Sequence, residues 1–470
     1  MKEKVLPVSA WLLVLLLTAA CGSTGGGGGA PAAQCGAKAT AFGLEQKPLQ
    51  MDQKSTRYIV KATSGLRELL SRDRFTGLQK RLGLRAPLEA IAREHFIVEF
   101  KARADVETGL QSLLKNALIE YAEPDIRVQR FNTPNDPMFQ NQWAHGIVQS
   151  AAAWDISVGS SSVVVAVLDT GVDYSHPDLR DNIWINPREI AGNGRDDDGN
   201  GYVDDVRGYD FANNDNDPMS DDSGVYHGTH TAGTVGASGG NAIGIAGHAP
   251  VVKIMPVKFL AGDGGGDLSA AIRAIDYAVA NGAKVMNNSW GSPQASRALA
   301  DAVARARDAG VLFVAASGNG GSDGVGDNND AQPVYPASFP YDNVISVASS
   351  GRGDSLSGFS NYGARTVHVA APGEDILSTM NGGRYQMMSG TSMASPLVSG
   401  VLALMISRRP DLNYQQIKAA LLTSVDTNAS LQGRVSSGGR VNAFKALRAV
   451  SNGGPVVTPP PGGQTPASCP

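Results

Sequence analysis

The sequence contains little cysteine, few aromatic residues and no excess of positive charge. Three cysteines occur among 470 residues, aromatic residues make up 6% and the formal net charge is -4. Cys21 follows an apolar leader, and Cys35 and Cys469 lie in low-complexity flanks, so the fold does not depend on a disulfide framework. No basic patch is interleaved with aromatic residues, which argues against nucleic acid as a partner.

The apolar leader is too short to cross a bilayer. After two early lysines, its apolar stretch spans residues 11–17, and small residues then lead into Cys21. This pattern predicts a secretory signal peptide over residues 1–21 and export of the protein. The ending LTAAC before a glycine tract resembles a bacterial lipobox, although Thr18 stands where an aliphatic residue is usual. Two outcomes stay open: acylation of Cys21, which would anchor a precursor to the cell envelope, or a plain signal peptide cut nearby.

Glycine is abundant, with 56 residues, and 42% of the chain is hydrophobic, which indicates a loop-rich globular α/β protein with a full core. Residues 22–54 predict a disordered Gly/Ala-rich linker, and residues 451–470 predict a Pro/Gly-rich tail. Residues 51–130 hold 15 Lys and Arg against 11 Asp and Glu, whereas residues 131–470 hold 21 against 31. A basic front segment and an acidic main body are therefore expected to attract each other.

Two patterns of secondary structure follow one another. The first predicts a small α+β module over residues 55–130, with strands at 55–62 and 95–102, helices at 65–84 and 106–118, and a third strand from residue 119. The second region, residues 131–450, begins with the linker NTPNDP, and from Trp143 onward its pattern changes. Helical stretches such as LSAAIRAIDYAVANG and SRALADAVARARDAG alternate with short apolar strands: VVVAVLD, VVKIMPVKF, KVMNNSWG, VLFVAASGN, VISVASS and VHVAAPG. This alternation is typical of a three-layer α/β fold with a mainly parallel sheet between helices.

Three motifs place reactive side chains where such a sheet collects them. Asp169 ends the run VVVAVLD, and active residues gather at the carboxyl ends of parallel strands. His227 and His230 open the segment HGTHTAGT, and Ser392 stands in GTSMASP, where a helix N-terminus favours developing negative charge. Taken singly, Asp169 could be a turn or cap residue. The histidines could be zinc ligands, although no third ligand has a matching spacing.

Taken together, VLDTGVDYSHPDL, HGTHTAGT and GTSMASP, in the order Asp, His, Ser, resemble the signature blocks of subtilisin-like serine proteases (subtilases, peptidase family S8). The resemblance implies that Asp169 orients the base His227, that Ser392 is the nucleophile, and that His230 is structural. Asn319 in VAASGNGG resembles the family's oxyanion-hole asparagine, although an isolated Asn beside glycines reads as a turn residue.

The resemblance also extends to substrate binding. It implies two edges that pair with an extended peptide, one formed by Gly264, Gly265 and Gly266 and the other by Ser289, Trp290 and Gly291. It also implies a primary pocket beside a third segment, formed by Ala316, Ser317 and Gly318. Backbone pairing of this kind predicts broad specificity for protein or peptide substrates. Gly320 follows Asn319 at a place where an acidic residue would favour basic side chains. We therefore expect a preference for large apolar residues before the scissile bond.

An acidic loop predicts a bound calcium ion. The spacing D-x-D-x-N-G in GRDDDGNGYVDDVRG fits the start of a calcium loop whose ligands would be Asp196, Asp198, Asn200, Asp204 and Asp205. The bidentate Glu expected at the twelfth position is replaced by Arg207, and Asp205 could substitute for it. The alternative is a solvated acidic loop without a metal. Clustered carboxylates repel one another, however, so a cation would relieve their repulsion.

Residues 55–127 resemble the inhibitory propeptide of the family (I9-like). This implies a self-processing zymogen whose own propeptide is a partner, cut between Ile126 and Asn135, so that a monomeric protease is released from any anchor at Cys21. Two other classes remain: a catalytically inactive subtilisin-like binding protein, which the intact triad argues against, and a lipase, which would have a G-x-S-x-G motif around its serine.

Overall fold

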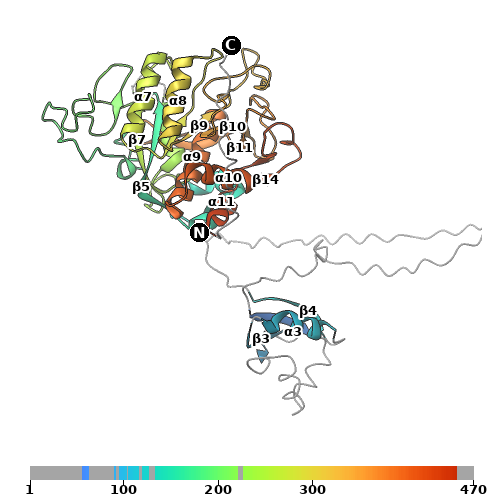
Figure 1. Cartoon of the computed structure of the whole chain (residues 1–470). Helices are drawn as coiled ribbons and strands as arrows, with labels where there is room; N and C mark the ends of the chain where they lie inside the picture. The colour runs from blue at the N-terminus through green and yellow to red at the C-terminus, as the bar shows by residue number, and fades with distance from the viewer. Residues whose placement is uncertain are drawn as a thin grey trace, which may run out of the picture. The chain divides into compact units, whose positions relative to one another are not determined.

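The computed structural model describes residues 56–62, 89–90, 95–102, 104–115, 119–125, 133–220 and 226–451. They belong to two compact units, Met1–Val128 and Gln129–Pro470 (Figure 1). Several predictions lie outside the described residues: the signal peptide with Cys21, the linker, the helix at 65–84, the cleavage segment before residue 133 and the tail. Among the described helices, none is both long enough and apolar enough to cross a membrane.

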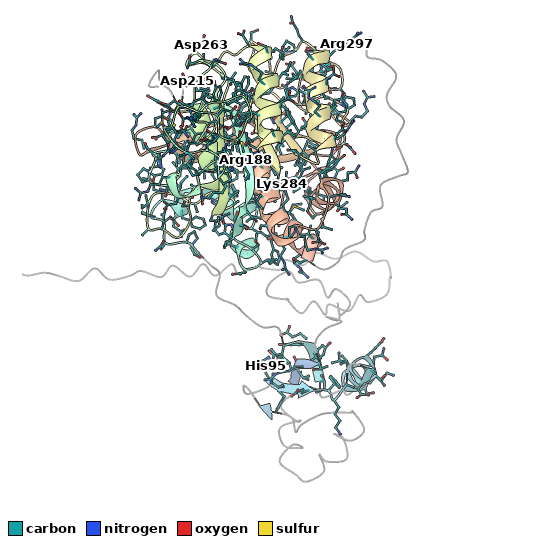
Figure 2. All side chains as sticks on the ribbon, turned by 60° about the vertical axis from the view of Figure 1, so that its left-hand side comes forward. His95, Arg188, Asp215, Asp263, Lys284 and Arg297 are labelled. Carbon is teal, nitrogen blue, oxygen red and sulfur yellow. The ribbon has the colours of Figure 1, made fainter. Side chains whose placement is uncertain are left out.

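The first unit contains an antiparallel sheet with one helix. The strand order is β2-β3-β1-β4, with β1 at Arg57–Ala62, β2 at Glu89–Ala90, β3 at His95–Glu99 and β4 at Ile119–Pro124. Helix α3 (Ala104–Leu114) begins two residues before the predicted helix, and its first turn carries two acidic residues, which favour a helix N-terminus. His95, labelled in Figure 2, lies 3.0 Å from the Tyr121 hydroxyl across the sheet.

The second unit is organised around a nine-stranded sheet with the order β14-β15-β11-β10-β9-β8-β5-β7-β6. The strands are β5 (Gly159–Asp169), β6 (Tyr209–Asp210), β7 (Val251–Lys258), β8 (Val285–Asn288), β9 (Leu312–Ala316), β10 (Val344–Ser350), β11 (Val369–Pro372), β14 (Asp426–Thr427) and β15 (Gly439–Arg440). Every pair is parallel except β14 with β15. The predicted mainly parallel sheet is confirmed.

Alternation along the strands explains why this sheet is covered on both faces. Val165 and Val167 of β5 belong to one core cluster, whereas Ala166 and Leu168 belong to the other. All four are buried, and successive side chains of a strand point to opposite faces. A strand without a polar face must be buried on both sides, so its sequence reads as one apolar run.

Helices form the two outer layers. Helices α7 (Leu268–Ala280) and α8 (Arg297–Asp308) pack on one face and lie side by side in Figure 1. The other face is covered by α6 (His227–Gly236), α9 (Thr391–Arg408), α10 (Tyr414–Thr423) and α11 (Ala443–Ser451). Two short helices, α4 (Trp143–Ile147) and α5 (Ser150–Trp154), and a hairpin of β12 (Ile376–Met380) with β13 (Arg384–Met388) complete this side.

The strands are shorter than predicted at their carboxyl ends. β8 ends at Asn288 and β9 ends at Ala316, so the residues that follow each strand leave the sheet as loops. Since both strands are parallel to β5, these loops and Asp169 lie at the same rim of the sheet. That rim is where the predicted reactive residues gather.

Candidate active site

Asp169 and His227 form the most constrained pair at this rim. His227 Nδ1 lies 2.8 Å and 3.0 Å from the two carboxylate oxygens of Asp169, which is completely buried. Asp169 also accepts the Thr170 backbone N–H at 2.8 Å. Burial by itself lowers the pKa of His227, but the Asp169 charge and hydrogen bond outweigh it and raise the pKa above 6.5. In the neutral ring, the contact with the carboxylate favours a proton on Nδ1, which leaves Nε2 able to accept one.

His230 occupies a different environment on the same helix. It is completely buried, and its Nε2 lies 3.0 Å and 3.1 Å from the carbonyls of Ile376 and Gln386 in the β12–β13 hairpin. Burial lowers its pKa to about 4. Because Nε2 donates to backbone carbonyls, it is not available as a metal ligand. His230 instead ties α6 to the hairpin.

Ser392 is presented by the first turn of α9. It is partly exposed between the buried Thr391 and Met393, and its hydroxyl donates to the Ser289 carbonyl at 3.3 Å. Pro396 has no N–H for the Ser392 carbonyl four residues earlier, and the Ser289 hydroxyl donates to that carbonyl at 2.9 Å instead. Two hydrogen bonds in opposite directions therefore connect Ser289 and Ser392.

Asn319 lies beside the start of the same helix. Its side-chain oxygen accepts both the backbone N–H and the hydroxyl of Thr391, each at 2.8 Å. With its oxygen occupied, the amide Nδ2 is left to face the space in front of α9. A Cβ at Gly390 would lie 3.4 Å from this nitrogen, so glycine keeps that space open.

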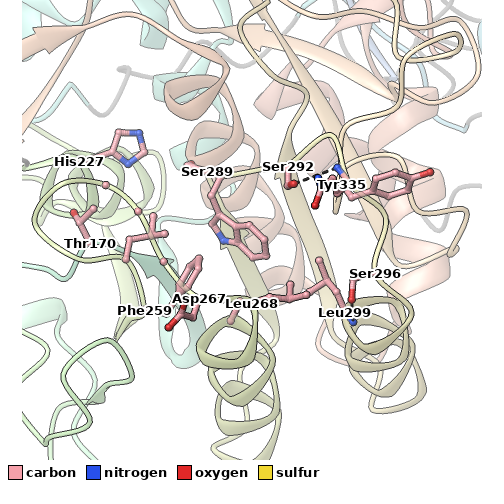
Figure 3. Close-up of a pocket in the computed structure, with 18 of the residues that line it drawn as sticks. Thr170, His227, Phe259, Asp267, Leu268, Ser289, Ser292, Ser296, Leu299 and Tyr335 are labelled. Atoms are coloured by element: carbon pink, nitrogen blue, oxygen red, sulfur yellow. Dashed lines mark hydrogen bonds between the residues drawn. The ribbon is translucent and has the colours of Figure 1, made fainter. Parts of the chain in front are cut away.

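A cleft of about 650 Å³ runs along the rim from His227 (Figure 3). Two of the predicted segments, 264–266 and 289–291, line it. Apolar residues that line it come from helices α7 and α8 and from the loops after β7 and β8: Phe259, Leu260, Leu268, Ala271, Trp290 and Leu299. An extended chain with apolar side chains fits such a cleft.

The third predicted segment, Ala316–Gly318, does not line this cleft. Ala316 and Ser317 are buried, and the Ser317 hydroxyl donates to the Asn361 carbonyl at 2.9 Å. The Gly318 N–H donates to the Thr391 hydroxyl at 3.2 Å. This segment therefore connects β9 to Asn319 and to the start of α9.

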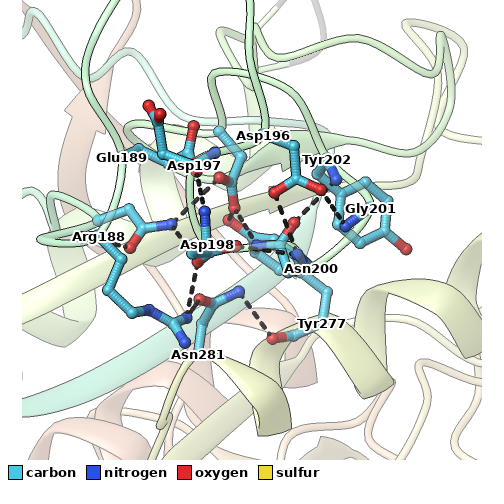
Figure 4. A network of polar contacts seen from close by, with 12 residues as sticks. Arg188, Glu189, Asp196, Asp197, Asp198, Asn200, Gly201, Tyr202, Tyr277 and Asn281 are labelled. Carbon is cyan, nitrogen blue, oxygen red and sulfur yellow. Dashed lines mark hydrogen bonds and ion pairs between the residues drawn. The ribbon is translucent and has the colours of Figure 1, made fainter.

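The acidic loop brings three carboxylates together, of which Glu189 and Asp198 are labelled in Figure 4. Ligand oxygens of Glu189, Asp198 and Asp205 lie within 4.8 Å of one another, and one Glu189 oxygen is buried without a hydrogen-bond partner. Burial raises the pKa of Asp205, while hydrogen bonds from Tyr277 and Asn200 oppose that effect. Hard oxygen ligands of this kind fit a calcium ion.

The remaining predicted calcium ligands take part in turns of the loop. Asp196 accepts the backbone N–H groups of Asn200 and Gly201 at 3.1 and 2.8 Å. Asp204 accepts those of two glycines, Gly192 and Gly194, at 2.8 and 2.9 Å. The three-carboxylate cluster thus contains two of the predicted residues together with Glu189.

Sequence reasoning did not identify Glu189 or Thr391. Glu189 lies before the D-x-D-x-N-G motif and joins the cluster because the loop folds back on itself. Thr391 was recognised only as a neighbour of Ser392, although the sequence GTS placed its hydroxyl next to the reactive serine. Only the fold shows that it contacts Asn319.

An α/β unit with a buried Asp–His pair at the rim of a parallel sheet and a serine in the first turn of a helix has the architecture of a serine hydrolase. Comparison with known proteins identifies the family. The model of the subtilase family (Peptidase_S8) matches residues 160–441. The chain therefore belongs to the subtilase family and is a serine-type endopeptidase.

Individual relatives extend over most of the chain. A thermophilic serine proteinase of Bacillus sp. (strain AK1) is 40% identical over 344 residues, which are 73% of this chain and 76% of that protein. Thermitase of Thermoactinomyces vulgaris is 38% identical over 317 residues, which are 67% of this chain and 99% of thermitase. A solved structure described as proteases from Pseudoalteromonas arctica PAMC 21717 has a TM-score of 0.57 and 31% identity, and covers 68% of this chain and all of that one.

Proposed function

We propose that the chain hydrolyses peptide bonds with the triad Asp169, His227 and Ser392, through an acyl-enzyme, and with broad specificity. The observation that carries the proposal is the 2.8 Å contact between His227 Nδ1 and the buried Asp169. It fixes the tautomer that a general base needs, and the Asp169 charge stabilises the imidazolium that forms.

In the first half of the reaction, the Ser392 hydroxyl turns from the Ser289 carbonyl toward His227. Nε2 takes its proton as Oγ attacks the carbonyl carbon, which forms the C–O bond and places a negative charge on the substrate oxygen. The Asn319 amide and the Ser392 backbone N–H would donate to that oxygen, and the N-terminus of α9 favours the charge.

In the second half, the intermediate collapses and the C–N bond breaks. His227 returns its proton to the leaving amine, and the acyl group remains on Ser392. Water then attacks the ester with His227 again acting as base, which releases the carboxylic acid and restores the serine. No cofactor takes part in these steps.

Substrate recognition would depend mainly on the backbone. The segments 264–266 and 289–291 that line the cleft support pairing with an extended peptide, and the apolar cleft residues support binding of apolar side chains. We propose a preference for large apolar residues before the scissile bond. Cleavage of a peptide library mainly after Lys or Arg would contradict this preference.

We further propose a structural calcium ion held by Glu189, Asp198 and Asp205. The buried oxygen of Glu189 without a partner and the raised pKa of Asp205 support it, because both are carboxylates that lack sufficient compensation. A divalent cation there would neutralise the loop and stabilise its turns, with no part in the chemistry.

We also propose export and self-processing. The leader supports export, with or without acylation of Cys21. The separate antiparallel unit before residue 129 supports a propeptide that inhibits the enzyme until the connecting segment is cut.

The test is labelling of the protein with a fluorophosphonate probe, together with hydrolysis of casein. We expect labelling and proteolysis by the wild type and neither by Ser392→Ala. A protein that folds but does not label would be the inactive binding protein. Labelling with hydrolysis of esters but not casein would indicate a lipase-like enzyme.

A further inference from the structure

Two buried asparagines from outside the triad surround the turn that carries Asn319. Asn361 is 2% exposed and Asn329 is completely buried. The Asn361 side-chain oxygen accepts the backbone N–H groups of Gly320 and Asp327, at 2.8 and 2.9 Å. Its amide nitrogen donates to the Asn329 side-chain oxygen at 3.0 Å. One side chain therefore holds the residue that directly follows Asn319.

Asn329 continues the contact to the other side of the turn. Its amide nitrogen donates to the Ser317 carbonyl at 2.8 Å, and the Ser317 hydroxyl donates to the Asn361 carbonyl at 2.9 Å. The Asn361 backbone N–H donates to the Gly318 carbonyl, also at 2.9 Å. The chain is thus held before and after Asn319, while Asn319 itself stays exposed.

The backbone of this turn requires such support. Gly318 and Gly320 have φ angles of 109° and 74°, in a region that glycine adopts easily and from which glycine can also leave easily. A Cβ at Gly318 would lie 2.6 Å from the Asn361 amide nitrogen, so the asparagine packs directly against the glycine backbone. Glycine permits this conformation, and the two asparagines select it.

The chemistry of the contact requires an amide at position 361. The side chain must accept two N–H groups with one atom and donate with the other, and only an amide of this length does both. A carboxylate would lose the donor, and an aliphatic side chain would lose both and leave buried backbone groups unpaired.

We propose that Asn361 and Asn329 are positioning residues that aim the Asn319 amide at the oxyanion, an inference that rests on the proposed role of Asn319. Thr391 holds the side chain of Asn319 by its oxygen, and the asparagine pair holds its backbone. Stabilisation of a transition-state charge depends on donors that are already in place before the reaction.

The experiment compares Asn361→Ala, Asn319→Ala and the double variant in the full-length enzyme. The concentration of folded sites is set by titration with a fluorophosphonate, and kcat and KM are measured on a peptide amide. A peptide aldehyde, which forms a tetrahedral adduct, reports on the oxyanion site separately. Asn343→Ala is the matched control, because Asn343 is also completely buried and its amide donates to a loop carbonyl, that of Val311, but at the opposite end of β10.

We expect Asn361→Ala to lower kcat by about 10- to 100-fold with little change in KM, because a displaced donor affects the transition state and not the ground state. Aldehyde affinity should fall by a similar factor. In the Asn319→Ala background the same substitution should have almost no further effect, and Asn343→Ala should change neither quantity. Asn329→Ala should reproduce the pattern of Asn361→Ala.

Additive losses in the double variant, or a raised KM with unchanged kcat, would overturn the proposal. Loss of titratable sites in both Asn361→Ala and Asn329→Ala would assign the pair to folding alone and would overturn it as well. If Asn319→Ala instead retains wild-type kcat, the proposed role of Asn319 fails. A loss of kcat in Asn361→Ala but not in Asn319→Ala would then show that Asn361 affects turnover without acting through Asn319, which overturns the positioning proposal as well.

Discussion

His227 and His230 stand three residues apart on one helix, and the same residue type behaves differently at the two positions. Burial acts to lower the pKa of both histidines. His227 faces the Asp169 carboxylate, which outweighs burial and raises its pKa, whereas His230 faces mainly backbone carbonyls and its pKa falls to about 4. The local sequence HGTH does not distinguish the two histidines. They differ in where each ring lies relative to Asp169 at the end of β5.

Asp169→Asn should test this difference directly. Without the carboxylate, the pKa of His227 should fall because only the effect of burial remains, and the tautomer is no longer fixed. We expect kcat to decrease by about 10⁴-fold. The acid limb of the kcat/KM profile should move to lower pH, since the base then stays unprotonated at more acidic values. A limb at its wild-type position would show that another group titrates.

Sequence reasoning at the residue scale worked where a motif is contiguous. Asp169, His227, Ser392 and Asn319 were all singled out, and the structure brings Asp169 to His227 and Asn319 to the start of α9. Their roles stay predictions. Asn361 was not identified, because its partner Gly320 lies 41 positions away and the contact exists only after β9 and β10 have paired.

Helix α9 shows how an element can carry a proline and remain intact. Pro396 removes one helical hydrogen bond near the N-terminus, and the Ser289 hydroxyl replaces it at the Ser392 carbonyl. The loop after β8 is thereby attached to the helix that carries Ser392.

Ser289→Ala should therefore destabilise the protein by about 1–3 kcal/mol, the usual effect of leaving a buried acceptor unpaired. Adding Pro396→Ala should restore part of that loss, because the new N–H can donate to the Ser392 carbonyl. Urea unfolding in the Ser392→Ala background, which prevents autolysis, measures both. No recovery in the double variant would mean that Ser289 acts mainly through Ser395 or Asn287, its other partners.

The acidic loop is connected to α7 through Tyr277, whose hydroxyl donates to Asp205 at 2.6 Å. If the proposed calcium ion is bound there, its removal should loosen both the loop and the helix that borders the cleft. In the Ser392→Ala background, we expect EDTA to lower Tm. If calcium was present at a hundredfold excess over its Kd, the free energy of unfolding should fall by about 3 kcal/mol.

Glu189→Gln should abolish most of that EDTA response. Asp411→Asn, which removes an exposed carboxylate paired with Arg409, is the charge-matched control and should keep it. An unchanged Tm on chelation of the Ser392→Ala protein would exclude the ion. A response that persists in Glu189→Gln would place it elsewhere.

Long strands were predicted from the sequence, whereas very short strands were missed. The apolar runs of β5, β7 and β10 are unmistakable, whereas β6, β14 and β15 have two residues each and carry no periodic pattern. The hairpin of β12 and β13 was also missed. Its β13 is mostly exposed, so it lacks the continuous apolar run by which the other strands were recognised.

At the scale of the whole molecule, we expect buried histidines to make the second unit sensitive to acid. Burial lowers the pKa values of His145 and His230 to about 4 and that of His368 to about 3. His145 also stacks on the buried His248, with ring centroids 4.1 Å apart, so two rings that share one site must both stay neutral. A charged imidazole in such a site would lack compensation.

The sign of the effect follows from the direction of these shifts. Because the folded state binds these protons less readily than the unfolded state, the stability they contribute is complete above about pH 6.5 and is lost as pH falls toward 4. The free energy of unfolding of Ser392→Ala, measured at a series of pH values, should show this loss. Adding His145→Phe should make the loss of stability toward low pH smaller. Adding His227→Asn should not make it smaller, because the pKa of His227 is shifted in the opposite direction. Equal slopes for His145→Phe and its parent would refute the argument.

Maturation is also a property of the whole chain. If the first unit is a propeptide removed by the enzyme itself, Ser392→Ala should accumulate at full length and associate with membranes where Cys21 is acylated. The wild type should be shorter, soluble and begin near residue 130. Mass spectrometry of both N-termini after expression in a lipoprotein-processing bacterium decides the matter. Equal processing of the two would assign the cut to another protease, and a membrane-held mature wild type would disprove release.

The position of β15 has a consequence for the order of events during synthesis. This strand lies between β11 and β14, and its Arg440, 3% exposed, pairs with Asp354 and Asp426. A ribosome delivers the triad motifs well before these last residues. The growing chain would therefore hold all three residues of the proposed triad while its sheet is still open at one edge, and completion of the fold has to await residue 440.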